Sequence, residues 1–167
     1  FSIVLVRVLV RLTGFFDEPV PAYKTVPAGS RVYLQDKGLT ELPEISSKID
    51  YLNLDRNRLT SIAAVANLTE LKWLRLNENN LSALPDLSRL SKLRRIYLRD
   101  NRFTAVPETL KDLPALTDIE LSGNPITVIP EWLAKKPGLK KLSFNRTYLT
   151  RLPEDLSAWK TLKWLQL

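Results

Sequence analysis

The sequence predicts an α/β repeat solenoid of about seven short parallel strands, each followed by a return segment. Three observations predict it: a motif recurs every 20 to 23 residues, apolar residues alternate inside each copy, and an apolar–Pro pair follows most copies. A unit of this length cannot bury its own apolar face, whereas stacked neighbours bury it together. The chain has 167 residues, which suits one such domain.

The clearest copy of the motif is LKWLRLNENNL at residues 71–81. In Leu74-Arg75-Leu76 the leucines alternate with a polar residue, so the leucines point to one face of a strand and Arg75 to the other. Further copies lie at residues 49–59, 93–103, 116–126 and 139–149, with a degenerate first copy at 29–39 and an incomplete one at 162–167. Strands are therefore predicted at residues 32–34, 52–54, 74–76, 96–98, 119–121, 142–144 and 165–167.

An asparagine recurs where the chain leaves each of four central strands: Asn57, Asn79, Asn101 and Asn124. An amide side chain both donates and accepts hydrogen bonds, so these residues can bond the backbone of their own and of the adjacent repeat. We predict a structural ladder of asparagines. Because Lys37 and Thr147 take this position in the first and sixth copies, we expect the ladder to weaken towards both ends.

The return segments carry a proline followed by an acidic residue. Proline at the start of a helix and a carboxylate next to it favour a short helix or 3₁₀ turn. Such turns are predicted after Pro43, Pro85, Pro107, Pro130 and Pro153.

The consensus L-x-x-L-x-L-x-x-N-x-L resembles that of the leucine-rich-repeat family, and the resemblance covers residues 29–167. It implies a horseshoe or arc with the parallel sheet on the concave face and helical or 3₁₀ turns on the convex face. It also implies binding of a partner protein by the concave face. The short repeats, the LP-type return segments and the lack of cysteine are similar to bacterial and intracellular members.

The two ends of the sequence differ from the repeats. Residues 1–16 are apolar but for Arg7, Arg11 and a few small polar residues, so we expect residues 1–28 to form a capping segment and a Pro-containing linker before the repeat domain at 29–167. A secretory signal and membrane contact through 1–16 are the alternatives; two arginines disfavour a membrane span. The last repeat lacks a polar cap, so either the native chain continues or the edge self-associates.

The composition excludes several classes of chemistry. Without Cys and His the chain has no disulfides, no tetrahedral zinc site and no Ser-His or Cys-His nucleophile, so we expect no enzyme, no metal and no cofactor. Asp118 and Glu120 could share a face, but catalytic carboxylates need a desolvated cleft. The lack of disulfides and of a clear cleavable signal favours the cytoplasm over the bacterial cell envelope or secretion.

Aromatic and arginine side chains gather on the predicted concave face. These residue types dominate binding at protein interfaces, although packing between strands can also place them there. We expect Trp73 and Arg95 to be exposed, so that replacing them would weaken binding without lowering the melting temperature. The candidate partner-binding residues are Tyr51, Trp73, Arg75, Arg94, Arg95, Tyr97 and Arg99.

The sequence therefore predicts a protein-binding module. A first alternative is the recognition arm of a larger bacterial effector or enzyme, because LTELPEI at residues 39–45 resembles the LP-rich repeats of bacterial effectors. A second alternative is electrostatic binding to nucleic acid or an anionic membrane, which the net charge of +7 permits. Nucleic acid is not favoured, because acidic and basic residues are interspersed.

Overall fold

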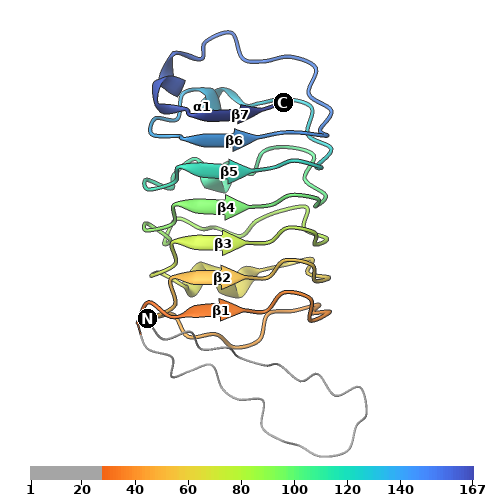
Figure 1. Cartoon of the computed structure of the whole chain (residues 1–167), viewed down its shortest axis with the longest axis vertical. Coiled ribbons are helices and arrows are strands. Elements are labelled where there is room, and N and C mark those ends of the chain that lie inside the picture. The colour runs from red at the N-terminus through yellow and green to blue at the C-terminus, as the bar shows by residue number, and fades with distance from the viewer. Residues whose placement is uncertain (1–27) are drawn as a thin grey trace, which may run out of the picture.

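The computed structural model describes residues 28–167, which form a stack of repeats along one axis (Figure 1). Each repeat contributes one three-residue strand, and all neighbouring strands pair in parallel and in sequence order. This confirms the predicted α/β repeat solenoid. The strands are β1 (Arg31–Tyr33), β2 (Tyr51–Asn53), β3 (Trp73–Arg75), β4 (Arg95–Tyr97), β5 (Asp118–Glu120), β6 (Lys141–Ser143) and β7 (Trp164–Gln166).

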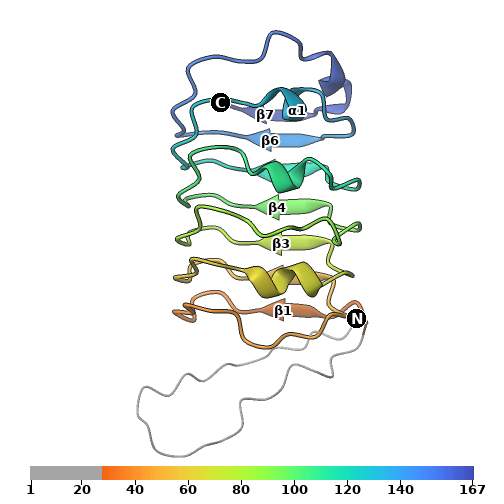
Figure 2. The same cartoon turned by 180° about the vertical axis from the view of Figure 1, so that it is seen from behind.

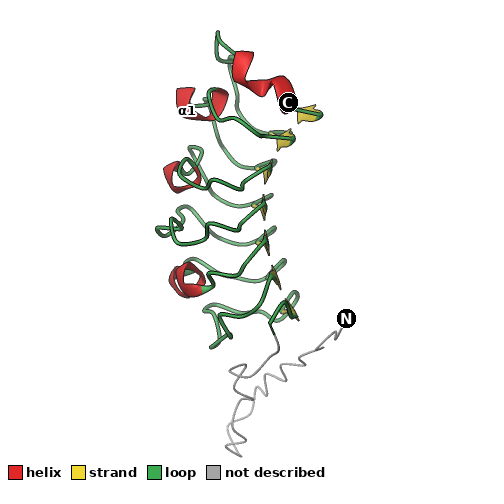
Figure 3. Ribbon diagram, turned by 90° about the vertical axis from the view of Figure 1, so that its left-hand side faces the viewer, coloured by secondary structure: helices red, strands yellow, loops and turns green. Residues whose placement is uncertain are grey.

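The strands line one side of the stack and the helical turns line the other. Figure 2, seen from behind, shows the turns in front of the sheet, and in Figure 3 the strand side is the concave one. The turns are η1 (Ala63–Asn67), η2 (Glu108–Leu110), α1 (Glu131–Ala134) and η3 (Ser157–Thr161). None of the helices in residues 28–167 is long and apolar enough to span a membrane. The predicted capping segment and linker at residues 1–28 lies, but for Ala28, outside the described residues.

Leucine side chains from every repeat fill the space between the two sides. The alternating strand residues point inwards, and Leu52, Leu74, Ile96 and Leu142 are fully buried. The core is continuous along the stack, because each repeat covers the apolar side of the one before it. Phe103 stands where other repeats carry leucine and is only 1% exposed, so the core accommodates a larger side chain there.

The asparagines form a hydrogen-bonded ladder behind the carboxyl ends of the strands. The amide of Asn79 donates to the carbonyls of Leu54 and Leu76, 3.0 and 3.1 Å away, and its Oδ1 accepts the N–H of Leu59. Asn101 repeats this pattern with the carbonyls of Leu76 and Leu98. Each amide thus bonds two successive repeats at once, and these buried carbonyls receive a donor.

The ladder also accounts for an error in the predicted strand bounds. Every strand begins and ends one residue earlier than predicted, so that Leu76, for example, follows β3 (Trp73–Arg75). Its carbonyl bonds the amides of Asn79 and Asn101 and not the neighbouring strand. The ladder thus takes the carbonyl just beyond the strand, while the N–H groups of Leu76 and Glu78 still bond the carbonyls of Tyr97 and Arg99 in the next repeat.

The prediction of helical turns after proline is only partly right. Pro107 and Pro130 directly precede η2 and α1, as expected. No helix follows Pro85; the Asp86 carboxylate accepts the N–H of Ser88 at 2.8 Å in a local turn, and Asp155 makes the same bond with Ser157 just before η3. No helix follows Pro43 either, and after Pro153 the helix η3 starts only at Ser157. Conversely, η1 lies in a repeat that has no proline in its return segment.

Candidate functional site

The concave face consists of the outward-pointing residues of the seven strands. Because alternate residues point to opposite faces, the first and third residues of each strand face outwards. Parallel pairing aligns them in two columns across the sheet. The first column contains Arg31, Tyr51, Trp73, Arg95, Asp118, Lys141 and Trp164, and the second Tyr33, Asn53, Arg75, Tyr97, Glu120, Ser143 and Gln166.

Trp73 stands at the centre of an ordered stack in the first column. The Arg95 guanidinium carbon lies 4.3 Å from the centroid of the indole ring, within the range of a cation–π contact. The Tyr51 ring meets Trp73 edge-on at 5.7 Å, and Arg31 lies 5.8 Å from the same indole. Side chains from four successive repeats therefore hold one another in place.

Arg95 is fixed on its other side by Asp118. Its Nε lies 3.2 Å from the Asp118 Oδ2, and the side chains are 38% and 7% exposed respectively. A carboxylate this well buried needs a counter-ion, so the pair contributes to the fold as well as to the surface. The prediction that Trp73 and Arg95 are exposed is therefore wrong, because both are half-buried, and we expect replacement of Arg95 to lower stability.

The second column repeats this arrangement around Arg75. Arg75 Nη2 and Nε lie 2.6 and 2.7 Å from Asp55 Oδ2, and its guanidinium stacks on Tyr97 with 5.4 Å to the ring centroid. Partial burial disfavours the charged form of Arg75, but the hydrogen bond and attraction of Asp55 outweigh it and raise its pKa. Arg75 is accordingly held as a fixed cation.

Tyr51 is the candidate for which burial contradicts the expectation of an exposed binding residue. It is only 9% exposed, because its ring packs against Tyr33 at 5.3 Å and against Trp73. Burial also raises the pKa of its hydroxyl. Tyr51 therefore packs between Tyr33 and Trp73 on the neighbouring strands and supports the stack rather than forming an exposed contact.

The other candidates divide between the centre and the edges of the face. The structure brings Trp73, Arg75, Arg95 and Tyr97 together on β3 and β4; we call these four residues the central patch. Arg94 and Arg99 flank β4 at opposite ends. Arg94 is exposed, whereas Arg99 pairs with Glu78 at 2.7 Å and with Asp100 at 3.4 Å in the turn beyond the strand.

Two acids that orient the central patch, Asp55 and Asp118, were not predicted as part of the site. A signal for Asp118 was present, because it occupies the same motif position as Arg95 with opposite charge. Asp55 follows a buried leucine, and its other oxygen accepts the N–H of Asn77 at 2.8 Å. Both acids therefore hold neighbouring side chains in place. Glu120 on β5 is also hydrogen-bonded, because it accepts the N–H of Ser122.

A shallow pocket borders the patch on its N-terminal side. It has a volume of about 150 Å³ and is lined by Arg31, Asp50, Tyr51, Lys72 and Trp73. Lys72 and Asp50 pair across it at 3.4 Å. Within residues 28–167 no group of acidic side chains is arranged to hold a metal ion. The geometry is that of a rigid surface with aromatic and guanidinium groups, which suits recognition of another molecule.

The comparisons with known proteins agree with this architecture. The family model described as Leucine rich repeat matches residues 47–103 and 69–126. Together with the seven-stranded solenoid, this match confirms the predicted leucine-rich-repeat fold. No curated protein sequence matches the chain significantly.

Two solved bacterial structures are similar over 81% of the chain. YopM from Yersinia enterocolitica WA-314 is 33% identical with a TM-score of 0.67, and the match covers 28% of YopM. An internalin (inlF) from Listeria monocytogenes str. 4b F2365 is 19% identical with a TM-score of 0.66, and the match covers 40% of it. The chain thus spans less than half the length of either neighbour. Leucine-rich-repeat domains commonly serve as protein-interaction modules.

Proposed function

We propose that the chain binds a partner protein through the concave face, with the central patch at the middle of the interface. The observation that carries the proposal is the order of this patch. Trp73 and Arg95 stack at 4.3 Å, Arg75 and Tyr97 at 5.4 Å, and both arginines are pinned by well-buried acids. Side chains that are already ordered lose little conformational entropy on binding, so more of the contact energy becomes affinity.

The residue types support a protein as the ligand. Trp, Tyr and Arg are enriched among interface residues whose truncation costs the most affinity. The pocket beside Trp73 has a volume of only about 150 Å³, which disfavours a buried small molecule. A second candidate is the same surface acting as the recognition part of a longer protein, which the partial coverage of YopM and the internalin favours.

Site-specific photo-crosslinking tests the proposal even though the partner is unidentified. A photoreactive phenylalanine analogue replaces Tyr97 on the concave face, and in a matched chain it replaces Lys111 on the convex side. We expect a discrete protein adduct from position 97 in cells that express the chain, and none from position 111. Adducts from position 111 alone, or equally from both positions, would contradict binding by the concave face.

A further inference from the structure

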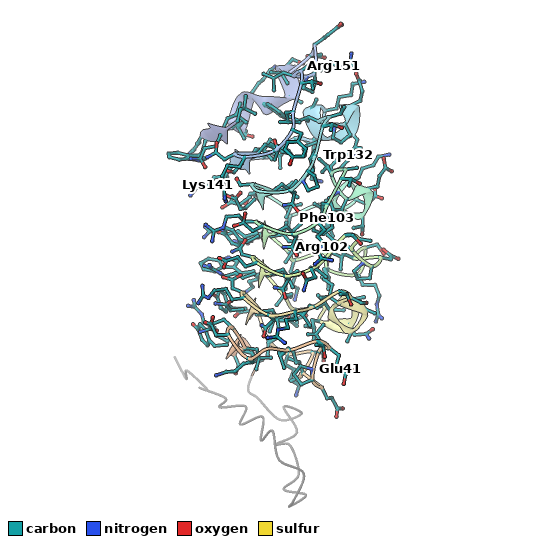
Figure 4. All side chains as sticks on the ribbon, turned by 90° about the vertical axis from the view of Figure 1, so that its right-hand side faces the viewer. Glu41, Arg102, Phe103, Trp132, Lys141 and Arg151 are labelled. Atoms are coloured by element: carbon teal, nitrogen blue, oxygen red, sulfur yellow. The ribbon has the colours of Figure 1, made fainter. Side chains whose placement is uncertain are left out.

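A row of exposed cations follows the edge of the sheet where the strands begin. Arg94 directly precedes β4, Lys140 and Lys141 enter β6, and Lys163 directly precedes β7; we call these four residues the cationic row. All four are exposed, and none forms an ion pair with any described residue. In Figure 4 Lys141 lies on the strand side of the molecule, opposite Trp132 on the convex side.

The backbone fixes the spacing of this row. The N–H of Lys140 bonds the carbonyl of Thr117 at 2.8 Å, and the N–H of Lys163 bonds the carbonyl of Lys140 at 2.8 Å. Adjacent strands are about 4.8 Å apart, so the row extends about 14 Å from β4 to β7. Like charges on neighbouring strands repel one another, so this row is unfavourable for the fold on its own.

The acids near the row do not neutralise it. Asp118 is bound to Arg95 and buried, and Asp50 is bound to Lys72. The opposite edge of the sheet differs, because its arginines are paired: Arg99 with Glu78 at 2.7 Å and Arg146 with Asp100 at 3.0 Å. Four exposed cations without an acidic partner among the described residues therefore lie together at one edge of the concave face, next to the central patch.

We propose that the cationic row binds an extended acidic segment of the partner protein, an inference that rests on the proposed function of the concave face. An extended peptide rises about 3.3 Å per residue and presents alternate side chains on one side, so four or five residues cover the row. Such a segment places two or three carboxylates over Arg94, Lys140 and Lys141. A hydrophobic or aromatic residue beside it then reaches Trp73.

The distribution of charge favours a peptide over nucleic acid or a membrane. A long polyanion places phosphates across a broad surface, and its affinity grows with the number of phosphates that it neutralises. Here the face also presents Glu120 at the end of β5, and the paired acids Glu78 and Asp100 lie beyond the ends of β3 and β4. A short acidic segment follows the row and avoids these carboxylates.

Fluorescence anisotropy of the full chain with a labelled peptide of alternating Glu and Ser tests the inference, with the matching Gln and Ser peptide as reference. In about 0.15 M salt, where distant charges are screened, we expect the Glu and Ser peptide to bind the chain more tightly than the Gln and Ser peptide does. Replacing three cations of the row (Arg94→Gln, Lys140→Gln, Lys141→Gln) should weaken the affinity for the acidic peptide about tenfold, or about 1.4 kcal/mol. Lys140→Arg with Lys141→Arg should preserve binding.

The matched control removes the same number of exposed, unpaired cations from the return segments: Lys111→Gln, Arg151→Gln and Lys160→Gln. It should change the affinity less than twofold. Equal loss in both variants would overturn the inference, because net charge alone would then explain binding. Failure of the unmodified chain to prefer the acidic peptide would also overturn it, whereas an adduct from position 97 would still support the concave face.

The same two variants distinguish the other polyanions. An oligothymidylate and phosphatidylserine vesicles serve as probes. We expect the triple substitution in the cationic row to lower the affinity for either probe less than it lowers the affinity for the acidic peptide. A larger loss for either probe would overturn the choice of a peptide and assign the row to phosphate groups.

Discussion

The two faces of the same short strands differ in how closely the repeats resemble one another. On the inner face and behind the strands the residue types recur: leucines fill the core, and Asn57, Asn79, Asn101 and Asn124 make equivalent bonds. On the concave face the first column changes from arginine to tyrosine, tryptophan, arginine, aspartate and lysine. The contrast teaches that the inner residues specify the fold, while the outer ones are free to specify a ligand.

The core side of this comparison gives the largest expected effect. Phe103→Ala should reduce the free energy of unfolding by about 3–5 kcal/mol, because the ring is buried and its loss leaves a cavity. Phe103→Leu should cost much less, since the same motif position holds Leu81 in the preceding repeat and Ile126 in the following one. Urea denaturation measures both. Equal losses for the two variants would mean that the site is not packed as its neighbours are.

The asparagine ladder should give the next largest effect. Asn101→Ala leaves the buried carbonyls of Leu76 and Leu98 without this donor and should cost about 1–3 kcal/mol. Thr147→Ala should cost less, because the Thr147 hydroxyl bonds only the carbonyl of Phe144 in its own repeat. If denaturation shows the same small loss at both positions, the ladder does not stabilise the stack.

Arg95 lies on the concave face yet should show an intermediate cost. Arg95→Ala leaves the Asp118 carboxylate, 7% exposed, without its counter-ion and should destabilise the fold by about 1–2 kcal/mol. Adding Asp118→Asn should recover part of this loss, which a double-mutant cycle in thermal denaturation measures. Absence of coupling between the two positions would show that the ion pair does not contribute to stability.

The smallest effect on stability is expected along the cationic row. Lys141→Ala should change the free energy of unfolding by less than about 0.5 kcal/mol, because the side chain is exposed and has no ion pair among the described residues. The same denaturation experiment measures it. A loss as large as that of Asn101→Ala would place Lys141 with the structural residues.

The sequence predicted the inner face well, because a strict period and an alternating apolar pattern report directly on burial. Leu74 and Asn79, for example, lie where their motif positions predict. The outer face was harder to predict, because motif position gives the direction of a side chain but not its contacts. Tyr51 and Arg95 share a column, yet one is covered by neighbouring rings and the other is bound to an acid of the next repeat.

The return segments show a different limit of the sequence. The Pro–acid pairs predicted helical turns uniformly, but the segment after Pro85 has no helix, although Ser88 donates to Asp86 as Ser157 donates to Asp155 at the start of η3. Both segments read Asp-Leu-Ser, so the same local bond occurs with and without a following helix. The convex side varies in structure while the strands remain alike.

The affinity of the crosslinked partner for variants of the two faces tests the central claim most directly. Trp73→Ala with Tyr97→Ala removes the two aromatic rings of the central patch and leaves both buried acids paired. Isothermal titration calorimetry should show a loss of roughly 2 kcal/mol or more, about thirtyfold in Kd. Convex substitutions Lys111→Ala and Lys135→Ala should leave Kd unchanged. A loss on the convex side, or none with both rings removed, would contradict the assignment of binding to the concave face.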